Sequence, residues 1–296
     1  MALFRSPWAN PVLASVYSVT TETGAYILRI HRGDDDSWKK VLMTQEIASQ
    51  HGVAPAIIHI DHVERAAVSV RVSDISLGAA LSRPETRGAA LRSLLETLTK
   101  LHAIPAGPFA AINLIGDARS IWDEQVQRRG FPNWAIQLGG RIPEADELLQ
   151  HDDRKVLSHC DLHPANILWD KRQVWLVDWE RAGLAHPYLD LATICNFLSM
   201  PDQEALSMLE QQEQAPIEEA QKFLFAALRN LCRVVYGTVF FRLVSDLASI
   251  ELPNREDTPT LRECFEMLLA GKLNLGEPQG RALVGAAFLK QCEIAT

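Results

Sequence analysis

Three oxygen-bearing side chains in one segment have the types and spacing that could carry phosphoryl transfer. Asp161 and Asn166 form an Asp-x-x-x-x-Asn pattern, and Asp178 ends the second of two apolar runs that flank a polar turn. A hairpin over these runs would bring Asn166, at the start of its first strand, close to Asp178. Magnesium prefers oxygen ligands and is usually held by one or two protein groups together with phosphates and water. Asn166 and Asp178 are therefore candidate magnesium ligands.

Asp161 lies on the loop that leads into this predicted hairpin. Its carboxylate could orient a substrate hydroxyl and accept its proton, which is the role of the aspartate in the phosphoryl-transfer layout. Taken singly, an Asp near a proline can cap a turn and an Asn before a strand can hold a bend. Their order, spacing and hairpin context together favour the catalytic interpretation.

The residues before this segment predict a small α+β lobe. Two β-rich runs, Val12–Val19 and Ala25–His31, flank a polar turn, and a helix is expected over Trp38–His51 before Gly52 and Pro55 end it. Strands are expected at Ile57–Ile60 and Ala66–Val72. The predicted order is strand, strand, helix, strand, strand.

After Asp74 the pattern becomes mainly helical. Leucines at helical spacing predict a helix over Arg87–His102, weaker helices are expected at 116–128 and 143–150, and the chain beyond residue 185 is almost wholly helix-forming. For a chain of 296 residues we expect a two-lobed α+β fold. The lobes would be an N-terminal nucleotide-binding lobe, 1–73, and a helical lobe, 74–296, that carries the catalytic loop and the hairpin.

The segment His159–Leu168, followed by Val177–Glu180, resembles the aminoglycoside phosphotransferase and choline kinase superfamily. The resemblance extends to Leu101 and His102 at the end of a helix and to His186–Ala192. It implies a protein-kinase-like fold and an enzyme that transfers the γ-phosphate of ATP, with magnesium, to a hydroxyl of a small molecule.

The resemblance also implies roles for individual residues. Asp161 corresponds to the catalytic aspartate, Asn166 and Asp178 to the metal ligands, and Glu180 to a group that assists the metal. His163 is placed to approach the transferred phosphate, although a loop histidine bonded to the backbone is nearly as good an explanation. Two further residues are expected to be structural: His159 braces the catalytic loop, and Asp190 ties a following helix to it.

In the first lobe, Arg29 matches the strand position at which the family contacts nucleotide phosphates, and Glu46 on the next helix is its expected ion-pair partner. Arg29 favours the choline, ethanolamine and thiamine kinase side of the superfamily. The chain departs from the family at the phosphate-covering loop, where only residues 6–11, without glycine, are available. Two alternatives stay open: an antibiotic phosphotransferase for aminoglycosides or macrolides, and a catalytically silent relative that binds a nucleotide or a protein.

Composition limits the remaining functions. A formal net charge of −8 argues against nucleic acid as a partner. The five cysteines are widely spaced without a CxxC pair, as expected of free thiols in a reducing compartment. The N-terminus does not look like a secretion signal, and Phe223–Ile250 contains too many charges for a simple membrane span. We therefore expect a cytoplasmic protein with a buried helix there; the sequence leaves its oligomeric state open.

Overall fold

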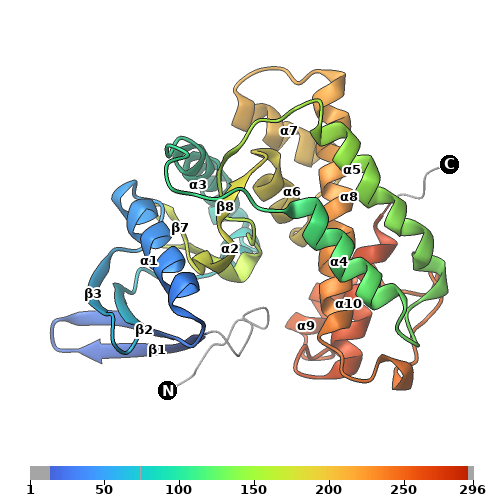
Figure 1. Ribbon diagram of the computed structural model, residues 1–296, viewed down its shortest axis with the longest axis horizontal. Helices are drawn as coiled ribbons and strands as arrows, with labels where there is room; N and C mark the ends of the chain where they lie inside the picture. The colour runs from blue at the N-terminus through green and yellow to red at the C-terminus, as the bar shows by residue number, and fades with distance from the viewer. Residues whose placement is uncertain (1–13, 74, 293–296) are drawn as a thin grey trace. The chain divides into compact units, whose positions relative to one another are not determined.

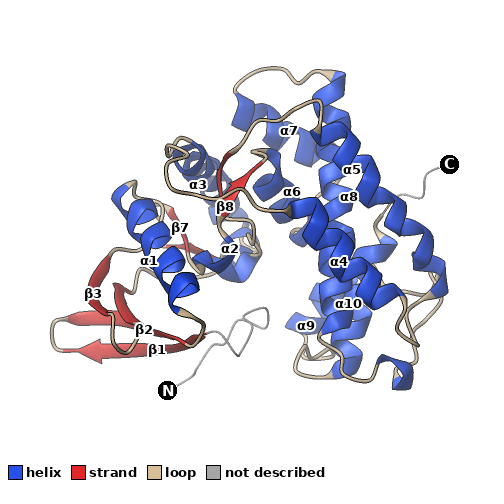
Figure 2. Ribbon diagram, viewed as in Figure 1, coloured by secondary structure: helices blue, strands red, loops and turns tan. Residues whose placement is uncertain are grey.

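The computed structural model describes residues 14–73 and 75–292 (Figure 1). The described chain forms two compact units. The first runs to Ala111 and takes in Lys155–Asp190, and the second combines Ile112–Arg154 with the chain from Leu191 onwards. A small antiparallel sheet near the N-terminus and a mainly helical C-terminal part confirm the expected α+β fold class (Figure 2). The units do not coincide with the expected lobes 1–73 and 74–296, so that lobe boundary stays a prediction.

The first unit begins with a four-stranded antiparallel sheet. Its strands are β1 (Ala14–Thr21), β2 (Gly24–His31), β3 (Ile57–Asp61) and β4 (Ala66–Val70), in the order β1-β2-β4-β3. Arg29 on β2 lies directly opposite Val16 on β1 and Ala67 on β4. Because directly opposed residues share a face of the sheet, Arg29 projects on the same face as Ala67.

Helix α1 (Asp35–Gln50) covers this face of the sheet. Asp34 caps its start by accepting a hydrogen bond from the Ser37 backbone nitrogen at 2.7 Å. Trp38 and Leu42 of α1 pack against Ala67, with the half-buried side chains of Ile57 and Ile60 beside them. The predicted order of strand, strand, helix, strand, strand is confirmed, and apolar burial between α1 and the sheet fixes the position of Arg29.

The rest of the first unit surrounds a short hairpin. Helices α2 (Leu77–Leu81) and α3 (Pro84–His102) precede β5 (Val156–Ser158), β6 (Ile167–Trp169), β7 (Val174–Leu176) and β8 (Gly183–Ala185). Strand β6 pairs with β7, as predicted, and β5 pairs with β8. Helix α3 holds the hairpin, because Ser93 Oγ accepts from the Val174 nitrogen at 2.8 Å and Thr97 Oγ1 donates to the Val174 carbonyl at 3.2 Å.

The second unit is helical within the described residues. It contains α4 (Leu114–Val126), α5 (Arg141–Leu149), α7 (Asp202–Glu213), α8 (Glu219–Arg242), α9 (Leu261–Leu269) and α10 (Pro278–Lys290), and α6 (Tyr188–Phe197) continues into it from the first unit. Helices α8 and α10 approach closely at two glycines: a Cβ on Gly285 would lie 2.9 Å from the Gly237 carbonyl oxygen. The ring of Tyr236 packs edge-on against Phe197 in the same core.

Helix α8 is the one described helix with the length and composition to cross a membrane. In its most apolar stretch, 78% of the residues are buried inside the protein. Core helices pass the same test of length and hydropathy, so this helix is weak support for a membrane span. The structure agrees with the sequence interpretation of this region as a buried helix.

Candidate active site

The loop between β5 and β6 is anchored by a buried aspartate on α6. Asp190 is fully buried and accepts hydrogen bonds from the backbone nitrogens of His159 and Cys160, each at 2.9 Å. Burial opposes the ionisation of Asp190, but its contacts with His102, at 3.4 Å, and His159 outweigh that effect and lower its pKa. These bonds hold Cys160 in the left-handed backbone region, with φ of 62°. The expected hydrogen-bond link between Asp190 and the loop before Asn166 is confirmed.

His159 joins this loop to the segment that carries Asp178. Its Nε2 atom donates to the Val177 carbonyl at 3.0 Å, and its ring lies 4.8 Å from the Trp179 ring, centroid to centroid. His159 and Trp179 are both fully buried. The residues on either side of Asp178 are therefore fixed against the loop, as expected of a bracing histidine.

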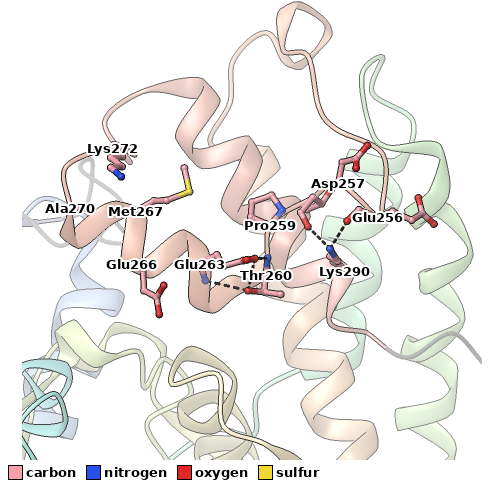
Figure 3. Close-up of a pocket in the computed structure, with 11 residues that line it drawn as sticks. Glu256, Asp257, Pro259, Thr260, Glu263, Glu266, Met267, Ala270, Lys272 and Lys290 are labelled. Atoms are coloured by element: carbon pink, nitrogen blue, oxygen red, sulfur yellow. Dashed lines mark hydrogen bonds between the residues drawn. The ribbon is translucent and has the colours of Figure 1, made fainter.

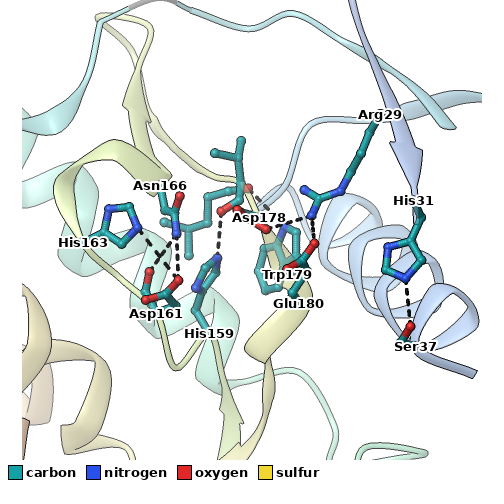
Figure 4. A network of polar contacts seen from close by, with 12 residues as sticks. Arg29, His31, Ser37, His159, Asp161, His163, Asn166, Asp178, Trp179 and Glu180 are labelled. Carbon is teal, nitrogen blue, oxygen red and sulfur yellow. Dashed lines mark hydrogen bonds and ion pairs between the residues drawn. The ribbon is translucent and has the colours of Figure 1, made fainter. Parts of the chain in front are cut away.

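Hydrogen bonds join Asn166 to Asp161 and to the residue before Asp178 (Figure 4). The Asn166 Nδ2 atom donates to the Asp161 carbonyl at 2.9 Å and approaches its Oδ2 atom at 3.4 Å. The Val177 nitrogen donates to the Asn166 carbonyl at 3.0 Å, one residue before Asp178. Asp161 and Asn166 thus adjoin Asp178 in one part of the first unit, as the hairpin argument predicted.

Arg29 on β2 forms ion pairs with two carboxylates at the edge of this cluster. Its Nη2 atom lies 3.0 Å from Asp178 Oδ1 and also contacts Glu180 Oε1. Burial works against the charge on Arg29, but Asp178 and Glu180 reverse its effect and raise the pKa of the guanidinium. For Glu180, burial dominates and raises the pKa of the carboxyl. Asp178 has a left-handed backbone, with φ of 71°, immediately before the short helix η3 (Trp179–Arg181).

The expected ion pair between Arg29 and Glu46 is not formed. Glu46 is half-buried on α1 and makes no ion pair within the described chain, whereas Arg29 pairs with Asp178 and Glu180. Two adjacent carboxylates offer the guanidinium more negative charge than one glutamate, which accounts for this choice. The structure thus assigns Glu46 no link to the cluster.

His163 lies beside Asp161, and its side chain is almost fully buried. Its Nε2 atom is 3.9 Å from Asp161 Oδ2. Burial, together with the nearby His159, lowers the pKa of His163 to about 3, although the charge of Asp178 opposes this. The imidazole is therefore neutral at physiological pH and has no positive charge to offer a phosphate.

The donor set of this cluster fits a magnesium ion. The Asn166 Nδ2 atom is committed to Asp161, so its Oδ1 atom is left as an acceptor, and the carboxylates of Asp178 and Glu180 add hard oxygen donors. Among the described residues, no three His, Cys, Asp or Glu side chains form a metal cage. Magnesium needs no such cage, because phosphates and water commonly complete its shell.

A separate surface hollow of about 740 Å³ lies along α9 and beside the end of α10 in the second unit (Figure 3). Two of its charged side chains, Glu263 and Lys290, take part in local structure. Glu263 accepts from the Thr260 nitrogen in a capping box, and Lys290 Nζ donates to the carbonyls of Glu256 and Thr258. The hollow contains none of the predicted site residues, and we assign it no part in catalysis.

The phosphate-covering loop, 6–11, lies outside the described residues. The sequence does not predict the contact of His102 with Asp190, although the Leu101-His102 pair resembles a family motif. No local sequence signal predicts this contact, because 88 residues separate His102 from Asp190.

Comparisons with known proteins bear on the family and the fold of the chain. A family model described as the phosphotransferase enzyme family matches residues 7–226. No curated protein matches the chain significantly in sequence. Similar solved structures include a choline/ethanolamine kinase family protein from Mesorhizobium loti, with a TM-score of 0.64, 17% identity and coverage of 96% of each chain.

Two further structures share the fold. Choline kinase LicA from Streptococcus pneumoniae has a TM-score of 0.58 and 15% identity, covering 76% of this chain and 79% of its own. Spectinomycin phosphotransferase, in complex with ADP and spectinomycin, has a TM-score of 0.60 and 13% identity, covering 95% of this chain and 91% of its own. At these identities the similarity establishes a shared fold.

Proposed function

Because the chain belongs to the phosphotransferase enzyme family, we propose that it is a small-molecule kinase that uses ATP and magnesium to phosphorylate a hydroxyl group. One pair of hydrogen bonds carries this proposal. The Asn166 side-chain amide donates to the Asp161 carbonyl, and the backbone nitrogen of Val177, the residue before Asp178, donates to the Asn166 carbonyl. This arrangement supports a centre in which a proton acceptor adjoins two metal ligands. Phosphoryl transfer requires such a centre.

In this mechanism Asp161 orients the acceptor hydroxyl and accepts its proton. Asn166 restrains the Asp161 side chain, and Asp190 fixes the backbone just before it. The residues that would hold magnesium are Asn166, Asp178 and Glu180; when bound, the ion neutralises charge that develops on the phosphate oxygens. Positioning and electrostatics then account for most of the acceleration.

For the acceptor, we propose a choline-, ethanolamine- or thiamine-like metabolite alcohol. Support comes from Arg29 on β2, because an arginine at this strand position resembles the choline, ethanolamine and thiamine kinases of the superfamily. The fold shared with a choline/ethanolamine kinase family protein over 96% of the chain also supports it. An antibiotic acceptor is the second candidate, because the fold shared with spectinomycin phosphotransferase also extends over 95% of the chain.

The proposal includes the organisation of the protein. Residues 1–73 would supply nucleotide contacts, with Arg29 on the phosphates, and residues 74–296 would supply the catalytic loop and acceptor site. We also propose a cytoplasmic location, which is consistent with the five free cysteines.

A screen for ADP formation tests the proposal. The purified chain would be incubated with magnesium and ATP against choline, ethanolamine, thiamine, simple sugars, homoserine, aminoglycosides and macrolides. Asp161→Asn serves as the blank, and the exposed Asp153→Asn serves as the matched control. ADP formation with one acceptor in wild type and Asp153→Asn, but not in the blank, is the expected result. Equal ADP formation in the blank would contradict the role of Asp161.

Expression in a sensitive host separates the two acceptor classes. A drug-modifying enzyme raises antibiotic tolerance, whereas a metabolite kinase leaves tolerance unchanged. If neither acceptor class is phosphorylated and magnesium nucleotide does not bind, the silent-relative alternative is favoured.

A further inference from the structure

Arg29 occupies the two carboxylates that the proposed function assigns to the metal. A single guanidinium nitrogen, Nη2, contacts both Asp178 Oδ1 and Glu180 Oε1. The side chains of Arg29, Asp178 and Glu180 are 15%, 19% and 18% exposed, so solvent screens these ion pairs only weakly. In this arrangement a positive charge already sits where a divalent cation would bind.

Arg29 also retains hydrogen-bonding capacity that the ion pairs do not use. Its Nε atom is buried and has no acceptor within the described chain. A buried donor without a partner is costly, and a phosphate oxygen would satisfy it. The Arg29 fork can therefore exchange carboxylate oxygens for phosphate oxygens of a bound polyphosphate.

The strand keeps Arg29 close to this site in either arrangement. Its backbone is paired on both sides, with Val16 on β1 and Ala67 on β4. The backbone is thus fixed by the sheet, and only the side chain is free to change partners. An exchange of partners by rotation of the side chain requires no movement of the sheet.

From these contacts, and resting on the proposed function, we propose that Arg29 makes metal binding conditional on nucleotide binding. Without nucleotide, the guanidinium neutralises Asp178 and Glu180 and repels a divalent cation. A nucleoside polyphosphate draws the guanidinium onto its phosphates, and the two carboxylates become available to the metal. Nucleotide and metal therefore bind with positive coupling, and each raises the affinity of the protein for the other.

Manganese binding tests this coupling without any turnover. Free Mn²⁺ would be titrated by electron paramagnetic resonance against the full-length protein, with and without a non-hydrolysable ATP analogue. Arg29→Gln removes the charge, and Arg65→Gln is the matched control, since Arg65 pairs with the exposed Asp35 away from the cluster. Without the analogue, Arg29→Gln should bind Mn²⁺ on the order of tenfold more tightly than wild type. Arg65→Gln should bind it like wild type.

A second variant tests the coupling without relying on Arg29→Gln to fold. Glu180→Gln weakens the hold on the guanidinium, so the ATP analogue in the presence of EDTA should bind several-fold more tightly than to wild type. The double variant with Arg29→Gln should lose this gain, because no guanidinium remains to be released. Circular dichroism would check that each variant is folded.

The outcomes separate this inference from the proposed function. If wild type binds Mn²⁺ with the analogue, and neither Arg29→Gln nor Glu180→Gln gains affinity, the coupling is overturned and the metal site stands. If wild type binds no Mn²⁺ with or without the analogue, the proposed function is overturned and the coupling with it.

Discussion

Replacement of Asp190 by asparagine would test how the catalytic loop is held. In the wild type, the two carboxylate oxygens each accept one backbone N–H, from His159 and Cys160, at 2.9 Å. Asparagine has one oxygen, so its NH₂ group would face one of these donors and leave a buried N–H unpaired. The variant keeps the size of the side chain, which limits the perturbation to hydrogen bonding and charge.

The magnitude follows from the bonds that are lost. An unpaired buried N–H costs about 1–3 kcal/mol, and bonds to charged groups contribute about 1.5–3 kcal/mol. We expect the free energy of unfolding to fall by about 2–4 kcal/mol in total, which leaves most domains folded. Because Cys160 directly precedes Asp161, we also expect kcat to fall more than the affinity for nucleotide.

Urea denaturation followed by tryptophan fluorescence measures the first effect, since Trp179 lies against His159. Asp153→Asn, an exposed replacement of the same kind, is the control and should change the free energy of unfolding by less than about 0.5 kcal/mol. If Asp190→Asn matched this control in stability and in kcat, the proposed anchoring of the loop would be wrong.

Two further predictions concern burial and packing. His163 has a pKa of about 3 in the folded chain and an ordinary value of 6.5, so between these pH values the unfolded chain binds a proton that the folded chain excludes. The free energy of unfolding should therefore fall by about 1.4 kcal/mol from this group for each pH unit below 6.5. When the free energy of unfolding is measured against pH, His163→Gln should make this decrease less steep. An equally steep decrease in the variant would contradict a buried, neutral His163. Gly285→Ala should cost about 1–3 kcal/mol because its Cβ would meet the Gly237 carbonyl. The control is Gly140→Ala, because a Cβ at that position would meet no atom within 4 Å. Thermal unfolding compares the two variants, and equal melting temperatures for Gly285→Ala and Gly140→Ala would contradict the close approach of α8 and α10.

The local elements of the first unit could be predicted because their signals are local. Strand β2 and the hairpin of β6 and β7 follow from apolar runs bounded by turn residues, and the helix α3 follows from its leucine spacing. The proximity of Asn166 and Asp178 followed from the same hairpin. The pattern of apolar and turn residues is enough to predict elements whose hydrogen bonds connect residues that are near in sequence.

The partner of Arg29 could not be predicted in this way. Asp178 and Glu180 are 149 and 151 residues away in sequence, and their approach depends on how α1, the sheet and η3 pack together. Glu46 was the plausible partner by resemblance, yet no local pattern could reveal that two carboxylates would outcompete it. The burial of His163 and its lowered pKa depend on the same tertiary packing.

Aromatic residues of the second unit show a similar limit. Residue type alone cannot distinguish a substrate-binding ring from a core ring, because both favour burial. Trp122 and Tyr236 are both buried, and their rings pack edge-on against Phe131 and Phe197. Their role as core residues became clear only from these contacts.

The most direct test of the phosphotransferase centre is the rate of γ-phosphate transfer from ATP in wild type and Asp161→Asn, measured at saturating nucleotide with the acceptor found in the screen. General base catalysis typically contributes about 10²–10⁴-fold, so we predict that kcat falls by at least about a hundredfold while the affinity for magnesium nucleotide is retained. An Asp161→Asn protein that transfers phosphate at the wild-type rate would contradict the assignment of Asp161 as the proton acceptor.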